Sequence, residues 1–169
     1  MSIVSFEDCL QSGGDGEKTA KYFLDFLGIE YMDTRDQRCG HDYYSHSLGK
    51  IEVKRNFDIH RKRLFVEEDH NSDPNIASLY KVWLHTTDSN FIWFVDKGNA
   101  KNEKKAGKLI VIFRTKDLKS FYCTNKSKYP LLENSITYKN GRPRNRSTYR
   151  DIPLEDIPEH LYIVLYSKN

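Results

Sequence analysis

The feature that most constrains the fold of this chain is the alternation of apolar and charged residues in the segment 50–55. Ile51 and Val53 are apolar, and each is followed by a charged residue, Glu52 and Lys54. A period of two is typical of a β-strand with one buried face, and it places the two charged side chains on one face, about 6.6 Å apart along the strand. The segment therefore predicts a strand that presents a carboxylate beside an ammonium group.

Asp42 belongs to a second predicted strand, residues 40–46. The three residues that follow it predict a hairpin loop, with Gly49 in the left-handed last position. Such a loop places Asp42 opposite Lys54 and diagonal to Glu52, within roughly 7–8 Å. We therefore expect two carboxylates and an ammonium group on one sheet face, where they can bind a metal ion and hold an attacking water. The alternative is a solvated strand face with a cross-strand salt bridge, because opposite charges commonly pair across sheets.

This order of Asp, then Glu-x-Lys on the next strand, resembles the PD-(D/E)xK nuclease superfamily. The resemblance implies that Asp42 and Glu52 are ligands of a divalent metal, with the main-chain carbonyl of Val53 as a further ligand. It also implies that Lys54 positions or activates the hydrolytic water, so that Asp42, Glu52 and Lys54 are the catalytic residues. His41 stands where the family name has proline, a position that varies within the superfamily.

The same resemblance implies a single α/β domain over residues 1–169, with a restriction-endonuclease-like αβββαβ core in which helices flank a mixed central β-sheet. Hydrophobic periodicity and turn residues place the elements in a compatible order. Helices are predicted from residue 15, over 73–85 and from residue 115. Strands are predicted at 40–46, 50–55, 64–68, 91–95, 108–114 and 161–166.

Glu17 lies at the edge of the first predicted helix's apolar stripe, which comprises Ala20, Phe23, Leu24 and Leu27. A carboxylate beside buried surface requires a cation or a basic partner. Many members of the superfamily carry an acidic residue on this helix, so the resemblance implies that Glu17 is a further metal ligand. Glu67 and Glu68, on the strand that follows, are interpreted as solvated acids at a strand end or as support for the metal site.

Composition predicts an ordinary soluble domain. The chain has 169 residues, of which 30% are charged and 38% hydrophobic. No apolar run approaches the roughly 18 residues of a membrane helix, and the N-terminus does not resemble a signal peptide, so we expect a cytoplasmic protein without a membrane partner. Cys9, Cys39 and Cys123 are widely spaced, which argues against a disulfide framework and against structural zinc.

Three basic segments are the predicted nucleic-acid contacts, because a net charge of +3 is too mild for a global electropositive surface. The first is Arg61-Lys62-Arg63, which follows closely on the Glu-x-Lys strand and for which a solvated turn is the alternative. The second is a lysine-rich loop at 97–108, for which a solvated surface is an equal alternative. The third is an arginine-rich loop at 138–150, in which five cations and no acid favour phosphate contact. The predicted nucleic-acid-binding residues are Arg61, Lys62, Arg63, Lys104, Lys105, Arg142, Arg144 and Arg146.

These features predict a divalent-metal-dependent endonuclease that hydrolyses phosphodiester bonds, with DNA as the expected substrate. Oxygen-rich ligation favours Mg²⁺ or Mn²⁺ as the cofactor, and such an ion lowers the pKa of bound water and neutralises charge on the phosphate. The small size suits action as a homodimer. Two alternatives stay open: a non-catalytic nucleic-acid-binding protein of the same fold, and an RNA endonuclease.

Overall fold

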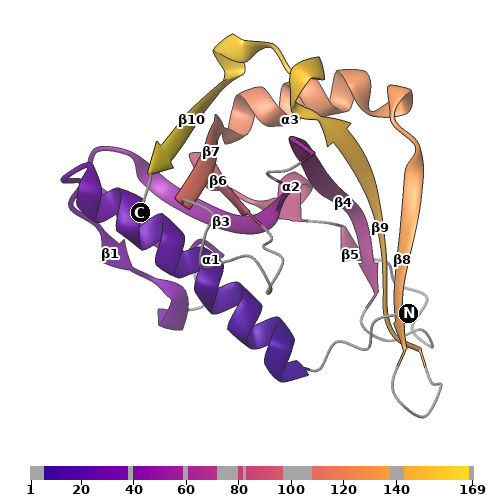
Figure 1. Ribbon diagram of the computed structural model, residues 1–169, viewed down its shortest axis with the longest axis horizontal. Helices are drawn as coiled ribbons and strands as arrows, with labels where there is room; N and C mark the ends of the chain where they lie inside the picture. The colour runs from indigo at the N-terminus through magenta and orange to yellow at the C-terminus, as the bar shows by residue number, and fades with distance from the viewer. Residues whose placement is uncertain are drawn as a thin grey trace.

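The computed structural model describes residues 6–37, 40–58, 61–71, 80–81, 83–96, 108–137 and 143–167. Figure 1 shows how the elements are arranged. The helical elements are α1 (Phe6–Phe26), η1 (Arg35–Gln37), α2 (Trp83–Thr86), α3 (Thr115–Asn125), η2 (Lys126–Lys128), η3 (Leu154–Asp156) and η4 (Glu159–Leu161). The strands are β1 (Met32–Asp33), β2 (Tyr43–Ser45), β3 (Gly49–Asp58), β4 (Arg63–Asn71), β5 (Tyr80–Lys81), β6 (Phe91–Asp96), β7 (Lys108–Arg114), β8 (Leu131–Thr137), β9 (Pro143–Pro153) and β10 (Tyr162–Ser167).

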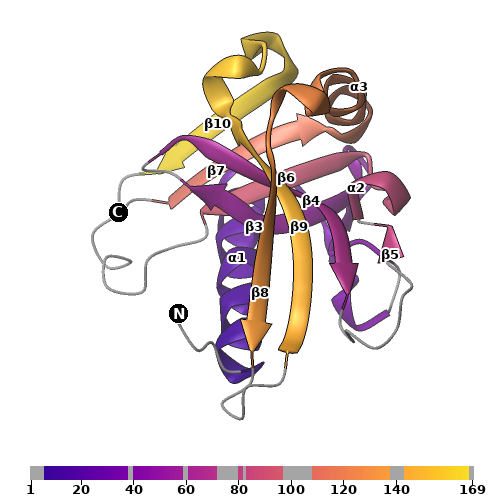
Figure 2. The same cartoon turned by 90° about the vertical axis from the view of Figure 1, so that its right-hand side faces the viewer.

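All ten described strands belong to one mixed sheet, in an α/β arrangement. The main order is β10-β7-β6-β3-β4-β9-β8, with β2 attached to β3, β1 to β2 and β5 to β4. The pairing of β3 with β6 is parallel, whereas the other pairings are antiparallel. β4 pairs with β3 at only two positions, and β4, β9 and β8 then run across the direction of β6 and β7 (Figure 2). β3 is therefore the strand at which the sheet divides.

Two helices cover opposite faces of the central strands. Along β6 the side chains alternate, so that Trp93 and Val95 pack toward α1 whereas Ile92 and Phe94 pack toward α3. The core under α1 also contains Ala20, Phe23, Leu24, Tyr43, Ile51 and Ile110. The core under α3 also contains Val111, Phe113, Leu118 and Tyr122.

The first helix ends where the sequence provides a glycine. Gly28 has a φ of 64°, and its N–H donates to the carbonyl of Asp25 at 3.1 Å. The N–H of Ile29 donates to the carbonyl of Leu24 at 2.9 Å, which completes a Schellman-type cap. This cap turns the chain from α1 toward β1 and the hairpin that follows.

Within the described part of the chain, no helix is both long and apolar enough to cross a membrane.

Most of the predicted elements are present, but three predictions are wrong. The first helix begins at Phe6 and not at residue 15. The predicted helix over 73–85 is a strand at 80–81, where β5 pairs with β4, and a short helix at 83–86; residues 72–79 and 82 lie outside the described residues. The predicted loop over 138–150 is strand β9 from residue 143 onward. β9 lies between β4 and β8, so pairing on both edges forms a strand whose sequence lacks apolar alternation.

Candidate active site

The β2–β3 hairpin decides which residues lie side by side at the predicted site. Ser45 pairs with Gly49, so the loop comprises residues 46–48 and Gly49 begins β3. The predicted register is therefore wrong by two residues. Continuing the observed pairing by one residue places Asp42 beside Glu52, and not opposite Lys54. Asp42 itself precedes β2, and its N–H donates to the Ile51 carbonyl at 2.9 Å, so the regular ladder does not extend to this residue and the predicted shared face of Asp42, Glu52 and Lys54 stays a prediction.

Asn90 explains the observed register. Its side-chain Oδ1 accepts a hydrogen bond from the N–H of Lys50 at 2.9 Å, and its own N–H donates to the Lys50 carbonyl at 2.8 Å. A Cβ atom on Gly49 would lie only 2.2 Å from Asn90 Oδ1, and the φ of Gly49 is 77°. Gly49 is left-handed as predicted, but these contacts hold it within the strand. Because Asn90 is 40 residues away, the hairpin sequence alone gives no signal of it.

The carboxylate of Asp42 occupies a gap along one edge of β3. On that edge β2 pairs only as far as Ile51, and β4 begins only at Phe57. The main chain of Asp42 donates to the Ile51 carbonyl at 2.9 Å, and its Oδ2 then accepts the N–H of Val53 at 2.6 Å. Alternate residues of a strand direct their polar groups to the same edge, so the Val53 carbonyl faces the same gap as Asp42.

Glu52 and Lys54 lie next to this gap on β3. Lys54 Nζ is 2.5 Å from Glu52 Oε1, and the Glu52 residue is only 9% exposed. The two residues pair in register with Ile92 and Phe94 of β6, which places them on the face that α3 covers. The strand prediction for segment 50–55 is thus confirmed, and a nearly buried carboxylate is paired with an ammonium group.

Burial and the neighbouring charges both act on the Asp42 carboxyl. Burial raises the pKa of the Asp42 carboxyl above its usual range, although the hydrogen bond from Val53 opposes this. The negative charge of Glu52 raises it further, whereas Lys54 and Arg35 lower it. A bound cation would oppose this shift, because a positive charge favours the ionised form of the Asp42 carboxyl.

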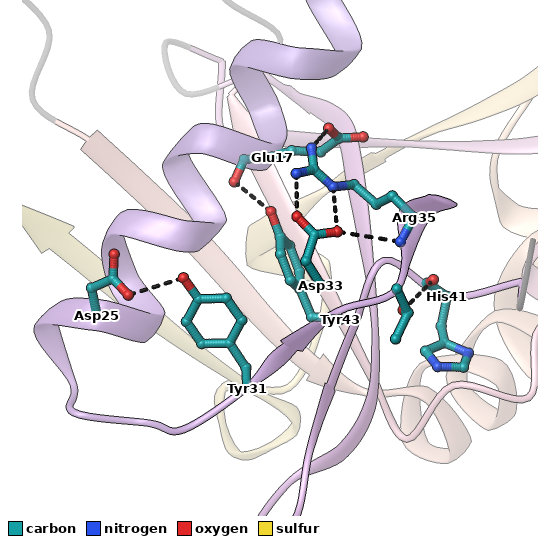
Figure 3. A network of polar contacts seen from close by, with 8 residues as sticks. Glu17, Asp25, Tyr31, Asp33, Arg35, His41 and Tyr43 are labelled. Atoms are coloured by element: carbon teal, nitrogen blue, oxygen red, sulfur yellow. Dashed lines mark hydrogen bonds and ion pairs between the residues drawn. The ribbon is translucent and has the colours of Figure 1, made fainter. Parts of the chain in front are cut away.

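Glu17 has the basic partner that its position requires. Its carboxylate forms an ion pair with Arg35, whose guanidinium also binds Asp33 (Figure 3). The hydroxyl of Tyr43 donates to the main-chain carbonyl of Glu17 at 3.1 Å, and this bond joins α1 to β2. The structure therefore does not bring Glu17 together with Asp42 and Glu52: among the described residues, no group of three or more His, Cys, Asp or Glu side chains is arranged to hold a metal ion.

The remaining donors nevertheless suit a hard divalent cation. Mg²⁺ in proteins is commonly held by one or two carboxylates and keeps several waters. Asp42 and Glu52 would supply the two carboxylates, and the Val53 carbonyl faces the same edge of β3. Oxygen donors without thiol or imidazole groups suit Mg²⁺ or Mn²⁺ better than zinc.

The residues predicted to contact nucleic acid differ in their surroundings. Arg61 is exposed and lies 4.0 Å from Asp58, whereas Arg63 Nε donates to Asp151 at 2.6 Å and is engaged within the fold. Lys62 forms the turn between β3 and β4, with a φ of 51°. The segment 97–107, with Lys104 and Lys105, and Arg142 lie outside the described residues. Arg144 and Arg146 lie on β9.

Arg35 is the partner of Glu17 that sequence reasoning did not identify. The requirement of a basic partner for Glu17 was a signal that could have found it, because Arg35 is the next arginine along the chain. The fold brings Asp33, Arg35 and Glu17 together through β1 and η1, which are too short to give a sequence pattern of their own.

A large cavity lies elsewhere and is not part of this site. It encloses about 610 Å³, and its lining, mostly apolar, includes Leu27, Trp93, Ile112 and Leu165. Neither Asp42, Glu52 nor Lys54 lines it. The large cavity is therefore separate from the candidate active site.

Comparison with protein-family models, with curated proteins and with solved structures found no match. The function must therefore be argued from the geometry of the site.

Proposed function

We propose that the protein is a Mg²⁺- or Mn²⁺-dependent endonuclease that hydrolyses phosphodiester bonds of DNA. The observation that carries the proposal is the Asp42 carboxylate on the Val53 N–H at 2.6 Å, beside the Glu52–Lys54 pair. The Asp42 carboxylate and the Val53 main chain thus lie at the edge of β3, next to the residues that carry the second carboxylate and the ammonium group. This is the donor set that the resemblance to the PD-(D/E)xK superfamily implies.

The order of elements supports the same proposal. A long helix, α1, precedes the β2–β3 hairpin, and β3 then pairs in parallel with β6 in a mixed sheet. The restriction-endonuclease-like αβββαβ core has helices on both sides of such a sheet; here α1 covers one face, and α3, which follows β7 in the chain, covers the other. The arm formed by β4, β9 and β8 is an addition to that core in our proposal.

The chain's own residues have distinct roles in this mechanism. Asp42 and Glu52 hold the cation, with the Val53 carbonyl as a further ligand. When bound, the cation makes water acidic and neutralises charge on the phosphate. Lys54 holds the water and donates a hydrogen bond to the charge that develops on phosphorus-bound oxygen.

Cleavage of nucleic acid by purified protein tests the proposal. Supercoiled plasmid, single-stranded DNA, branched DNA and RNA are incubated with Mg²⁺, Mn²⁺ or EDTA. We expect cleavage of DNA with either metal and none with EDTA, and loss of cleavage in Asp42→Ala and Glu52→Ala. Glu155→Ala is the matched control, because Glu155 is an exposed carboxylate on η3. Metal-independent cleavage, or full activity of either site variant, would refute the mechanism.

One observation favours the non-catalytic alternative. Lys54 is already neutralised by Glu52 at 2.5 Å, and a pair of this kind can simply stabilise a strand. A non-catalytic nucleic-acid-binding protein would bind DNA in both Ca²⁺ and EDTA and cleave none of the four substrates. Preferential cleavage of the RNA substrate would instead identify an RNA endonuclease of the same fold.

A further inference from the structure

Strand β10 lies at an outer edge of the sheet, beyond β7 (Figure 1). Its residues pair in register with β7, from Tyr162 with Phe113 to Ser167 with Lys108. None of the described strands pairs with the other side of β10. An edge strand presents a row of N–H and carbonyl groups that have no partner within the sheet. The outer side of β10 can therefore accept a further strand.

The other edges of the described sheet carry the features by which proteins discourage such pairing. β1 and β5 have only two residues each, and β8 carries the charged side chain of Glu133. Short edge strands and charged side chains both oppose the addition of another chain. β10 has six residues, of which none is charged and none is proline. It is therefore the edge that is suited to pairing.

β10 also exposes apolar side chains on both of its faces. Ile163 is 60% exposed, Val164 44% and Tyr166 54%. Ile163 lines the large cavity together with Leu27, which is also exposed, so the apolar surface continues from the strand toward the end of α1. Contiguous apolar patches on the surface of one chain commonly mark a site that another molecule covers.

The sequence of β10 indicates which molecule covers it. From Tyr162 to Tyr166 the strand consists of an aromatic residue, three aliphatic residues and an aromatic residue, so its chemical order is the same in both directions. Antiparallel pairing with a second copy about a two-fold axis at Val164 opposes Tyr162 with Tyr166. It also opposes Ile163 with Leu165, and Val164 with itself. Opposed residues share a face of the sheet, where paired aromatic side chains are stabilising.

Other positions of the two-fold axis match the side chains less well. An axis at Leu165 would oppose Ile163 with the polar Ser167. An axis at Ile163 would oppose Tyr166 with His160, which lies on η4 and outside the strand. On any such axis a charged residue would face its own charge in the second copy, which is destabilising. The uncharged strand therefore favours a second copy, with the axis at Val164.

We propose that β10 is the dimerisation strand of this protein and pairs with β10 of a second copy, antiparallel, about a two-fold axis at Val164. The two sheets then become one, in the order β6-β7-β10-β10-β7-β6. A two-fold interface uses the same surface on both copies, so it occupies the free edge and closes at a dimer. The inference goes beyond the proposed function and does not depend on it, because β10 carries none of the candidate site residues.

Sedimentation equilibrium of the full chain, from about 1 to 100 µM, tests the interface over the range of modest affinities. The wild type should be dimeric in the upper part of this range. Val164→Lys places like charges opposite each other at the axis and should raise the Kd of the dimer at least about tenfold. Leu131→Lys is the matched control, because Leu131 is 52% exposed on the edge strand β8. Its Kd should equal that of the wild type.

Several outcomes of this measurement would overturn the proposal. They are a wild type that is monomeric throughout, species larger than a dimer, and a Val164→Lys protein that dimerises as the wild type does. An equal loss of dimer in Leu131→Lys would do so too, because the effect would then not be specific to β10.

A mixture of two variants tests the position of the axis. Val164→Glu alone should be as weak a dimer as Val164→Lys, for the same reason. Because position 164 directly faces position 164 of the second copy, an equimolar mixture should form dimers at a concentration where each variant alone is monomeric. Added salt should weaken this mixed dimer, since its partly exposed ion pair is screened. A mixture that stays monomeric would contradict pairing about Val164.

Hydrogen exchange of the wild type gives a readout that needs no substitution, so a misfolded variant cannot obscure the result. If β10 is a free edge, its outward-directed amides exchange rapidly while those bonded to β7 are protected. In the proposed dimer, the outward-directed amides near Val164 should exchange at least about tenfold more slowly than in a free strand, because they are bonded to the second copy. Rapid exchange of these amides in dimeric protein would place the interface elsewhere and overturn the proposal.

Discussion

The side chain of Asp42 accepts a hydrogen bond from the main-chain N–H of Val53 at 2.6 Å. Asp42 lies just before β2, so this bond is made beyond the last pair of residues that joins β2 to β3. A carboxylate thus takes the place of a strand carbonyl and satisfies a partly buried N–H of the strand. This bond fixes the carboxylate on the strand that carries Glu52 and Lys54. Functional groups held by main-chain bonds to a sheet keep a defined geometry, which a metal site requires.

The position of Asp42 predicts a conflict between stability and function. In Asp42→Asn the amide oxygen can still accept the Val53 N–H, but the partly buried charge beside Glu52 is gone. We expect the free energy of unfolding at pH 7 to rise by up to about 1 kcal/mol, which raises Tm by about 2–4 °C in a chain of this size. Mn²⁺ should raise the Tm of the wild type and not that of the variant.

The pH dependence of the same variant checks its cause. Burial raises the pKa of Asp42 above its ordinary 3.8 in the folded protein, so the folded state holds this proton more tightly than the unfolded state. The contribution of Asp42 to stability therefore falls as pH rises from the ordinary pKa of 3.8 through the raised pKa of the folded state. The difference in Tm between variant and wild type should grow from pH 4 to pH 7. An Asp42→Asn protein that is less stable than the wild type at pH 7 would contradict this.

Lys54 is expected to act on the reaction and not on metal affinity. Lys54→Ala should reduce the single-turnover rate of DNA cleavage by roughly 10²–10³, as loss of one donor to developing charge typically does. Mn²⁺ should bind the variant at least as tightly, because the ammonium group no longer competes for Glu52. Calorimetry and quenched-flow cleavage separate the two effects, and a wild-type rate would exclude Lys54 from the mechanism.

The arginines before and within β9 are expected to contact the phosphate backbone. Changing Arg142, Arg144 and Arg146 together to Ala should lower the slope of log affinity against log salt by up to about 0.7–0.9 per lost contact, across unrelated sequences. Mn²⁺ affinity should not change, because these residues supply no ligand. The measurement is a salt titration of DNA affinity in Ca²⁺. An unchanged slope would make the 97–108 segment the better candidate for the contact.

Local periodicity was enough to predict the elements that carry the site, but not their register. The alternation around Glu52 and Lys54 predicted β3, and the stripe of Ala20, Phe23 and Leu24 predicted the helix that packs on it. Both patterns depend on burial of one face, which neighbouring residues in the sequence determine.

Features that depend on distant partners left no local pattern. The hairpin register depends on Asn90, which binds Lys50 across 40 residues of sequence. Strand β9 depends on β4 and β8, and its arginines resemble a solvated loop when the sequence is considered alone. Tertiary context commonly overrides strand propensity in this way. The partner of Glu17 was likewise found only when β1 and η1 placed Arg35 against α1.

Arg150 belongs to the same basic segment as the β9 arginines, but its contacts are internal. Its Nε donates to Glu68 Oε1 at 2.8 Å, and a terminal nitrogen donates to the Tyr129 carbonyl. The Arg150 and Glu68 side chains are only 17% and 12% exposed, and Lys126 lies 3.8 Å from the same carboxylate. Arg150 therefore joins β9 to β4 and to the end of η2, and we expect a role in stability.

Arg150→Met should destabilise the protein and leave the salt dependence of DNA binding unchanged. Breaking a buried ion pair from one side typically costs about 3–5 kcal/mol, and the remaining contact with Lys126 makes the lower end of that range the expectation.

Burial would raise the pKa of Glu68, but the hydroxyl of Tyr122 and the guanidinium of Arg150 together lower it below the ordinary 4.5. The stabilisation is therefore complete above pH 4.5 and is lost as pH falls through the lowered value. Urea unfolding should show a large difference between variant and wild type at pH 7 and a much smaller one near pH 3. Equal unfolding midpoints at pH 7, together with a reduced salt slope, would instead place Arg150 on the nucleic-acid surface.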